Sequence, residues 1–173
     1  TSGPRILLWF DLVNNQDSKN GKSPMGSLVE MNQNPEFEVR AMGSYVQKSG
    51  CPEDAYTALG EDRLNELCYN ECYNPSDERK KITRIEVIRV WPQEYINQPI
   101  DERIEDTWLV HNCDTDKLGC RFTFTDPDFS TMQSDVSYYA RAIEEPSPII
   151  NVKGAHCIFD EEGNCSEFKI CTQ

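Results

Sequence analysis

Apolar and polar residues alternate along several stretches of the chain, which is the pattern of strands with one buried face. Phe37, Val39 and Ala41 alternate with charged side chains, and residues 121–125 and 134–144 repeat this period of two. Because side chains two positions apart lie on the same face of a strand, one face of each stretch is expected to enter a core. The inward set of the last stretch is Val136, Tyr138, Ala140 and Ala142.

Other stretches are more uniformly apolar. The run ILLWFDL at residues 6–12 predicts a strand buried on both faces. The β-branched run at residues 82–91 predicts a long strand that Pro92 ends. A short strand is expected at residues 107–111. The stretch CIFDEEGNCSEFKIC predicts a closing hairpin that turns at residues 160–164.

A single helix is expected, at residues 60–68. This segment, GEDRLNELC, places Leu64 and Leu67 three apart on one face, behind two acidic residues suited to a helix N-terminus. Residues 49–56 are interpreted as a cysteine-bearing turn. The whole pattern, about seven or eight strands without alternating helices, predicts a mainly β fold. We expect one domain over residues 1–173, an antiparallel β-sandwich of immunoglobulin or fibronectin type with one short helix and disulfide-stapled loops.

Eight cysteines are the strongest signal in the composition. None belongs to a CxxC pair and histidine is scarce, so disulfides are favoured over a zinc site, which stays the alternative. Disulfides indicate an oxidising compartment, periplasmic or extracellular. Short separations predict two local bridges, Cys113–Cys120 and Cys157–Cys165. The connectivity of the other four stays open: Cys51, Cys68, Cys72 and Cys171.

Charge narrows the range of partners. The formal net charge is −13, from 17 lysines and arginines against 30 aspartates and glutamates. So acidic a surface repels phosphate backbones and anionic lipid heads, and neither nucleic acid nor membrane is expected as a partner. No apolar run approaches the roughly 18 residues of a membrane span. The opening TSGPRILLWFDL leads into a strand rather than an export signal, so a processed or excerpted chain is expected.

The stretch DPDFSTMQSDVSYYARAIEEPSPIIN poses a choice between a catalytic cluster and a sandwich strand. Tyr138 precedes a small inward residue after a turn, which resembles the tyrosine corner of sandwich domains and favours a structural role over catalysis. Glu144 and Glu145 stand at a strand end, where exposed carboxylates are ordinary, so an acid–base pair is the lesser alternative. His111 and His156 are isolated in the sequence. Phosphate-loop, nucleophile-elbow and zinc-protease motifs do not occur.

The loop CDTDKLGC offers one weak metal candidate. Asp114 and Asp116 stand at DxD spacing before a glycine, which is a fragment of a calcium-loop pattern. The alternative is a polar turn stapled by a disulfide between the flanking cysteines. Asp126 and Asp128 are interpreted as turn formers because they flank a proline.

Several blocks in order carry a family resemblance: TSGPRILLWFDL, FEVRAMG, GCPEDAYTAL, LCYNECYNPSDERKKITRIEVIRVWPQ, YYARAIEEPSPIIN and CIFDEEGNCSEFKIC. They span nearly the whole chain. Together they resemble the C-terminal portion of a bacterial family of exported proteins of unknown function. That family is assigned to the PHP (polymerase and histidinol phosphatase) superfamily of metal-dependent hydrolases.

The resemblance implies that a distorted α/β barrel with histidine- and aspartate-rich ligands for divalent metal precedes this segment in the parent protein. The chain holds none of those ligand motifs, so no catalytic residue, metal ligand or cofactor is assigned to it. The barrel of the same polypeptide is the implied partner, with Ser2, Gly3 and Arg5 at the junction. The family's usual C-terminal tail carries a further cysteine, so one cysteine of this excerpt would lack its natural partner.

The expected function is therefore a non-catalytic accessory β-sandwich domain of an exported PHP-type hydrolase. In the parent, metal-activated water would attack a phosphate ester or a similar bond. The alternative is a carbohydrate- or protein-binding β-sandwich module, with Trp9, Trp91 and Trp108 as candidate aromatic platforms. The substrate of the parent protein and the oligomeric state stay open.

Overall fold

The computed structural model describes residues 5–132 and 134–146, together with the backbone of residues 156–159 and 165–169. The fold is mainly β with antiparallel sheets, as the alternation predicts. The chain divides into two compact units. The first unit is Thr1–Ser44 with Arg79–Glu145, and the second is Tyr45–Glu78 with Pro146–Gln173. That the 173 residues form a single domain stays a prediction.

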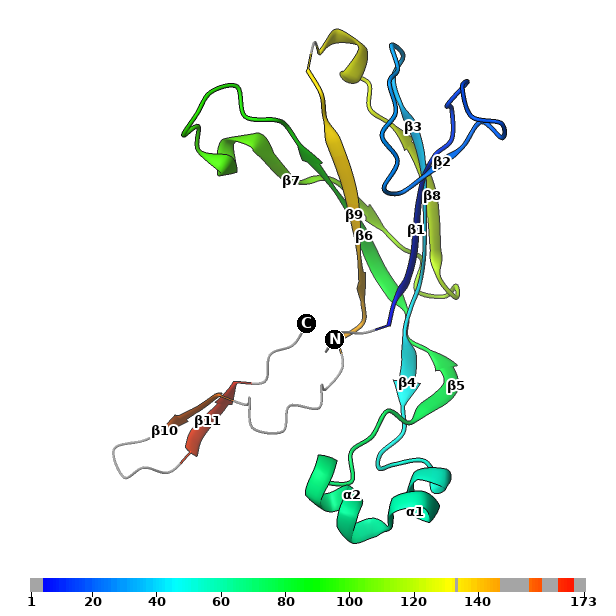
Figure 1. Cartoon of the computed structure of the whole chain (residues 1–173), viewed down its shortest axis with the longest axis vertical. Helices are drawn as coiled ribbons and strands as arrows, with labels where there is room; N and C mark the ends of the chain where they lie inside the picture. The colour runs from blue at the N-terminus through cyan, green and yellow to red at the C-terminus, as the bar shows by residue number, and fades with distance from the viewer. Residues whose placement is uncertain (1–4, 133, 147–155, 160–164, 170–173) are drawn as a thin grey trace. The chain divides into compact units, whose positions relative to one another are not determined.

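The first unit contains a four-stranded antiparallel sheet in the order β2-β1-β3-β8 (Figure 1). The register places Phe10 opposite Val39, and Val39 opposite Phe122 on the other side. These apolar side chains therefore form one row across the sheet. The strands are β1 (Leu7–Leu12), β2 (Ser23–Pro24), β3 (Glu36–Met42) and β8 (Cys120–Thr125).

A three-stranded antiparallel sheet, in the order β7-β6-β9, completes the first unit. The central strand β6 pairs with β9 from Ile82 to Val90, with an irregularity between Ile82 and Arg84, and Ile85 lies opposite Ala142. A β-bulge between Val87 and Arg89 interrupts its pairing with β7. The strands are β6 (Ile82–Val90), β7 (Ile104–Asn112) and β9 (Ser137–Glu144), and two short 3₁₀ helices are η1 (Ile100–Arg103) and η2 (Phe129–Thr131).

The core of the first unit lies between these two sheets. Phe37 of β3 contacts Tyr138 of β9 with ring centroids 4.7 Å apart, and Trp108 of β7 contacts Phe124 of β8 at 5.9 Å. Fully burying a side chain such as that of Phe37 stabilises the fold by about 1.5–3 kcal/mol. The buried cluster comprises Phe10, Leu12, Phe37, Val39, Ala41, Ile82 and Ile85. This sandwich-like packing agrees with the predicted architecture.

The alternation predicts most of the inward residues, with exceptions in β1 and at Val136, which is half-buried ahead of β9 and is not among the residues packed against the core cluster. Tyr138, Ala140 and Ala142 do pack against the core, as expected. The prediction that residues 6–12 are buried on both faces is wrong, because Leu7 is 42% and Trp9 is 40% exposed. An antiparallel sheet in a two-layer sandwich has one face toward solvent, so every second residue of β1 faces outward.

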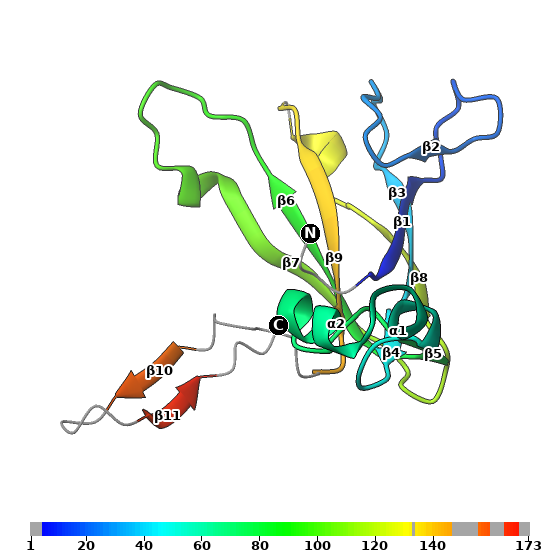
Figure 2. The same cartoon turned by 60° about the horizontal axis from the view of Figure 1, so that its bottom comes forward.

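The second unit contains a two-stranded sheet and two helices (Figure 2). Strand β4 (Tyr45–Gln47) pairs with β5 (Pro75–Arg79), and between them lie α1 (Glu53–Leu59) and α2 (Glu61–Cys68). The helices meet at Gly60, whose φ of 77° and ψ of 156° suit glycine and interrupt the helical path. None of the helices in the described part of the chain is long and apolar enough to cross a membrane.

The prediction of a single helix is wrong. Helix α1 begins at Glu53 and occupies the second half of the segment interpreted as a turn, because Pro52 has the extended conformation of an N-cap residue and two acidic residues fill the first turn. Helix α2 agrees with its predicted bounds. Its two leucines differ, however: Leu64 is 3% exposed and Leu67 is 55% exposed.

Strands β10 (His156–Phe159) and β11 (Cys165–Lys169) pair antiparallel, as the closing hairpin predicts. Their register places Cys157 opposite Phe168 and Cys165 opposite Phe159. The predicted turn at residues 160–164 and the side chains of both cysteines lie outside the described residues. The Cys157–Cys165 bridge therefore stays a prediction.

Candidate functional site

The most enclosed polar group in the described residues is the carboxylate of Asp126, which is fully buried just after β8. Arg89 on β6 donates Nη1 to both carboxylate oxygens, at 3.1 and 2.9 Å. The Tyr138 hydroxyl on β9 donates to Oδ2 at 2.6 Å, and the Asp128 amide donates to Oδ1 at 3.0 Å. This Asp126 network (Arg89, Asp126 and Tyr138) therefore connects the two sheets of the first unit.

Arg89 is held by aromatic rings as well as by carboxylates. Its guanidinium carbon lies 4.9 Å from the ring centroid of Trp91 and 4.5 Å from that of Trp108, within the range of cation–π attraction. It also forms an ion pair with Glu105 on β7. Burial by itself would lower the pKa of Arg89, but hydrogen bonds to Glu105 and Asp126 outweigh it and raise that pKa above its usual value. Arg89 is therefore a permanent cation.

The Asp126 network gives Tyr138 a structural role. Burial and, to a lesser extent, the hydrogen bond to the Asp126 carboxylate raise the pKa of the Tyr138 phenol well above its usual value. The hydroxyl consequently remains a proton donor to Asp126 and is not a nucleophile at neutral pH. The structural reading of Tyr138 holds, but its acceptor is a side chain rather than the backbone group that a tyrosine corner predicts. Asp126, interpreted only as a turn former, is the buried centre of the network.

A shallow hollow of about 360 Å³ lies beside Arg89's partners Trp91 and Glu105. Arg103, on its wall, pairs with Glu94 at 2.9 Å and donates to the Pro92 carbonyl at 2.9 Å. With three carboxylates against one guanidinium, the wall offers hydrogen-bond acceptors next to an indole ring. This Trp91 hollow is lined by Trp91, Glu94, Glu102, Arg103, Glu105, Met132 and Ser134.

Glu144 is buried, which corrects its interpretation as an exposed strand-end carboxylate. Its oxygens accept hydrogen bonds from the Ser44 amide at 2.9 Å and the Ser44 hydroxyl at 2.8 Å, and from Lys80 Nζ at 3.3 Å. Glu145 is exposed. Glu144 is the last residue of β9, and its side chain reaches Ser44, just after the end of β3. The Ser44 amide has left the sheet and needs an acceptor, which the Glu144 carboxylate supplies.

Cys113 and Cys120 form a disulfide, as their spacing predicts. Within the loop that they close, Asp114 accepts a hydrogen bond from the Asp116 amide at 3.0 Å and pairs with Lys117 at 3.0 Å. The hydrogen bond from Lys117 holds the pKa of the Asp114 carboxyl below its usual range. This geometry is that of a stapled polar turn, and calcium binding stays a prediction.

The remaining predicted positions are dispersed. The His111 ring stacks on Phe122 with centroids 4.1 Å apart, which is a packing contact. Arg5 is exposed ahead of β1, and the other two proposed junction residues, Ser2 and Gly3, lie outside the described residues, as does the His156 side chain.

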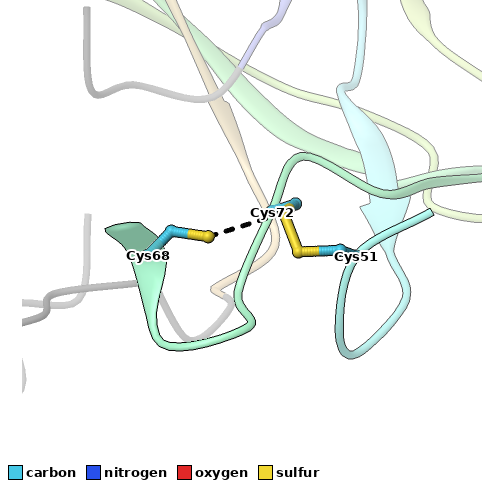
Figure 3. Close-up of side chains that lie close together, drawn as sticks. All are labelled: Cys51, Cys68 and Cys72. Carbon is cyan, nitrogen blue, oxygen red and sulfur yellow. Dashed lines mark hydrogen bonds between the residues drawn. A yellow bond between two sulfur atoms is a disulfide. The ribbon is translucent and has the colours of Figure 1, made fainter. Parts of the chain in front are cut away.

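Three sulfur atoms gather in the second unit, in a grouping that the sequence left open (Figure 3). Cys51, just before α1, forms a disulfide with Cys72, 21 residues later. Cys68, the last residue of α2, is the unbridged cysteine of the described part of the chain, and its Sγ lies 3.6 Å from that of Cys72. All three sulfurs lie within 4.8 Å of one another. We call Cys51, Cys68 and Cys72 the three-cysteine cluster.

The fold and these sites define a disulfide-containing, mainly β protein with antiparallel sheets. No family model, curated protein or solved structure matches the chain.

Proposed function

We propose that this chain is a non-catalytic accessory β-sandwich domain of an exported PHP-type metal-dependent hydrolase. One observation carries the non-catalytic part: each buried charged side chain of the described residues is bound to an oppositely charged partner within the first unit. These side chains are Glu38, Glu86, Arg89, Asp126 and Glu144.

Such pairing suits stability and opposes general acid catalysis. Hydrogen bonds from Arg121 lower the pKa of Glu38, and hydrogen bonds from Arg84 and Arg141 lower that of Glu86. A catalytic carboxylic acid needs the opposite shift, because it has to hold its proton near neutral pH. The ionisable groups of the first unit thus support a scaffold rather than a reaction centre.

The parent activity is proposed from the sequence resemblance. The resemblance implies a metal-binding barrel in the same polypeptide. The present chain would stabilise that barrel or shape the access of substrate to it. Two disulfides in the described residues, Cys51–Cys72 and Cys113–Cys120, support an extracytoplasmic location, because such bonds persist in oxidising compartments.

The test compares this chain with a longer polypeptide that includes the sequence encoded upstream of Thr1. Both are assayed with p-nitrophenyl phosphate and bis(p-nitrophenyl) phosphate, with Mn²⁺ or Zn²⁺ and with a chelator. We expect chelator-sensitive turnover from the longer polypeptide alone. Comparable metal-dependent turnover by the present chain would refute the accessory role.

A binding module is the second candidate, and the Trp91 hollow is the observation that favours it. Carbohydrate-binding sites combine an aromatic face with acceptors for sugar hydroxyls, and Trp91 stands beside three glutamates. Trp9 does not offer a free aromatic face, because Arg40 lies over its ring at 5.3 Å. Trp108 is half-buried against Arg89.

Titration calorimetry with a panel of neutral oligosaccharides tests this candidate. Binding should be lost in Glu102→Gln/Glu94→Gln, which alters the wall of the hollow, and kept in Trp9→Ala, which does not touch it. If the native chain gives no heat with any sugar tested, the hollow does not bind carbohydrate. A protein is then the ligand to test.

A further inference from the structure

The three-cysteine cluster is independent of the sandwich and of the function proposed above. Cys51 is 7% exposed, whereas Cys68 and Cys72 are half-buried. The separation of 3.6 Å between the sulfurs of Cys68 and Cys72 is close to the roughly 3–3.5 Å of a near-attack arrangement. Because all three sulfurs lie within 4.8 Å of one another, the Cys68 sulfur lies to the side of the Cys51–Cys72 bond, and attack requires a side-chain rotation that brings it into line with that bond.

Main-chain structure holds the three sulfurs together. After α2, Tyr69 and Asn70 both have positive φ, of 55° and 59°, and the Glu71 amide donates to the Cys68 carbonyl at 2.9 Å. The chain thus reverses and returns Cys72 to the end of the helix. On the other side, the Tyr56 hydroxyl of α1 accepts a hydrogen bond from the Cys51 amide at 3.4 Å.

We propose that the cluster is a thiol–disulfide exchange site in which Cys68 is the nucleophile and Cys72 the shared sulfur. The Cys68 thiolate attacks Sγ of Cys72, a Cys68–Cys72 bond forms, and the Cys51–Cys72 bond breaks. The electron pair of the broken bond leaves on Sγ of Cys51, which takes up the proton that Cys68 lost. One disulfide and one thiol are present before and after, so no oxidant or reductant is consumed.

The exchange changes both the free thiol and the covalent frame of the second unit. The thiol moves from half-buried Cys68 to buried Cys51, where reagents reach it less readily. The Cys51–Cys72 bond joins the start of α1 to the turn after α2, and the Cys68–Cys72 bond spans that turn alone. Exchange therefore releases the start of α1 from the end of the helical pair.

Peptide mapping reads the two isomers directly. Trypsin cleaves after Lys48, Arg63 and Arg79, so Cys51 lies in the peptide 49–63 while Cys68 and Cys72 lie together in the peptide 64–79. Purified protein is held without oxidant or reductant, quenched in acid, unfolded in N-ethylmaleimide and digested without reduction. The first isomer gives the two peptides joined, with Cys68 labelled. The second gives peptide 64–79 with an internal disulfide, and peptide 49–63 labelled at Cys51.

We expect both isomers in the native protein, and loss of the internally bridged 64–79 peptide to background in Cys68→Ser. Cys51→Ala, held in a buffer of oxidised and reduced glutathione, supplies the reference, because it should bridge Cys68 to Cys72. The Cys113–Cys120 bond of the first unit serves as the internal control.

Four outcomes would overturn the proposal. In the first, the native protein yields the joined peptides alone. In the second, Cys51→Ala keeps both remaining thiols free in the glutathione buffer. In the third, Cys68 is recovered bonded to Cys157, Cys165 or Cys171. In the fourth, all three sulfurs are reduced and bind zinc, as measured by elemental analysis of the purified protein.

Discussion

At the scale of single residues, the fully buried carboxylate of Asp126 accepts hydrogen bonds from Arg89, Tyr138 and the Asp128 amide. Asp126→Asn keeps the shape of the side chain but leaves Arg89 without its buried counter-charge. Because breaking a buried pair leaves an uncompensated charge, we expect a loss of about 3–5 kcal/mol in the free energy of unfolding, measured with urea. Asp128→Asn is the matched control: Asp128 lies 3.6 Å from Arg89 but is 56% exposed, so its loss should stay below about 1 kcal/mol. Equal losses would contradict this account.

Tyr138→Phe removes one donor to the same carboxylate. A hydrogen bond to a charged group contributes about 1.5–3 kcal/mol, and a loss of that size is expected. Since folding raises the pKa of Tyr138, its contribution is fully present below the unfolded value, 10.0, and declines as the pH rises above it. The free energy of unfolding of the native sequence should thus fall more steeply above pH 10 than that of Tyr138→Phe. If the free energies of unfolding of the two proteins fall equally steeply above pH 10, the Tyr138 phenol is not buried as described.

Glu86 should govern part of the acid sensitivity. Hydrogen bonds from Arg84 and Arg141 depress its folded pKa below 4.5, so its contribution is present above that pH and is lost as the pH falls through the folded value. Glu86→Gln should flatten the decline of unfolding free energy below pH 4.5, followed by urea titrations at several pH values. Glu102→Gln, at an exposed position, should keep the native slope.

At the scale of elements, the Cys51–Cys72 disulfide should stabilise the helical pair more than any single contact within it. A disulfide that closes a loop of this size restricts the unfolded chain and so raises the free energy of unfolding by about 3 kcal/mol. Cys51→Ala/Cys72→Ala should therefore accelerate hydrogen exchange at the amides of α1 and α2, while amides of β6 serve as the unchanged reference. Unaltered protection in both helices would show that their packing suffices without the bond.

The sequence predicts elements better where the information is local. The inward set Phe37, Val39 and Ala41 was readable from a period of two because a strand presents every second side chain to the same face. Helix α1 was missed because it is one short segment of seven residues, for which propensity is weak and packing decides.

The sites required tertiary structure. Arg89 and Asp126 are 37 residues apart, and neither has a neighbour in sequence that indicates the other. The Cys113–Cys120 bridge was predictable from a separation of seven residues. The Cys51–Cys72 bridge was not, because a separation of 21 residues becomes a bond only after two helices and a reversal have formed between them.

At the scale of the whole molecule, the net charge of −13 should dominate encounters with other macromolecules. Because like charges repel, we expect no measurable affinity for duplex DNA or for phosphatidylserine vesicles at physiological ionic strength. Fluorescence anisotropy with labelled DNA and vesicle co-sedimentation are the measurements. Binding that weakens steeply with added salt would reveal a basic surface that contradicts this prediction.

The placement of one guanidinium against the rings of Trp91 and Trp108 has a spectroscopic consequence. Two indoles fixed in an asymmetric setting absorb left- and right-handed circularly polarised light unequally in the near ultraviolet, whereas freely rotating indoles do not. This dichroism should vanish when the sheets separate, even if the strands themselves persist. The circular dichroism of these tryptophans therefore reports the tertiary packing of the side chains without an added dye.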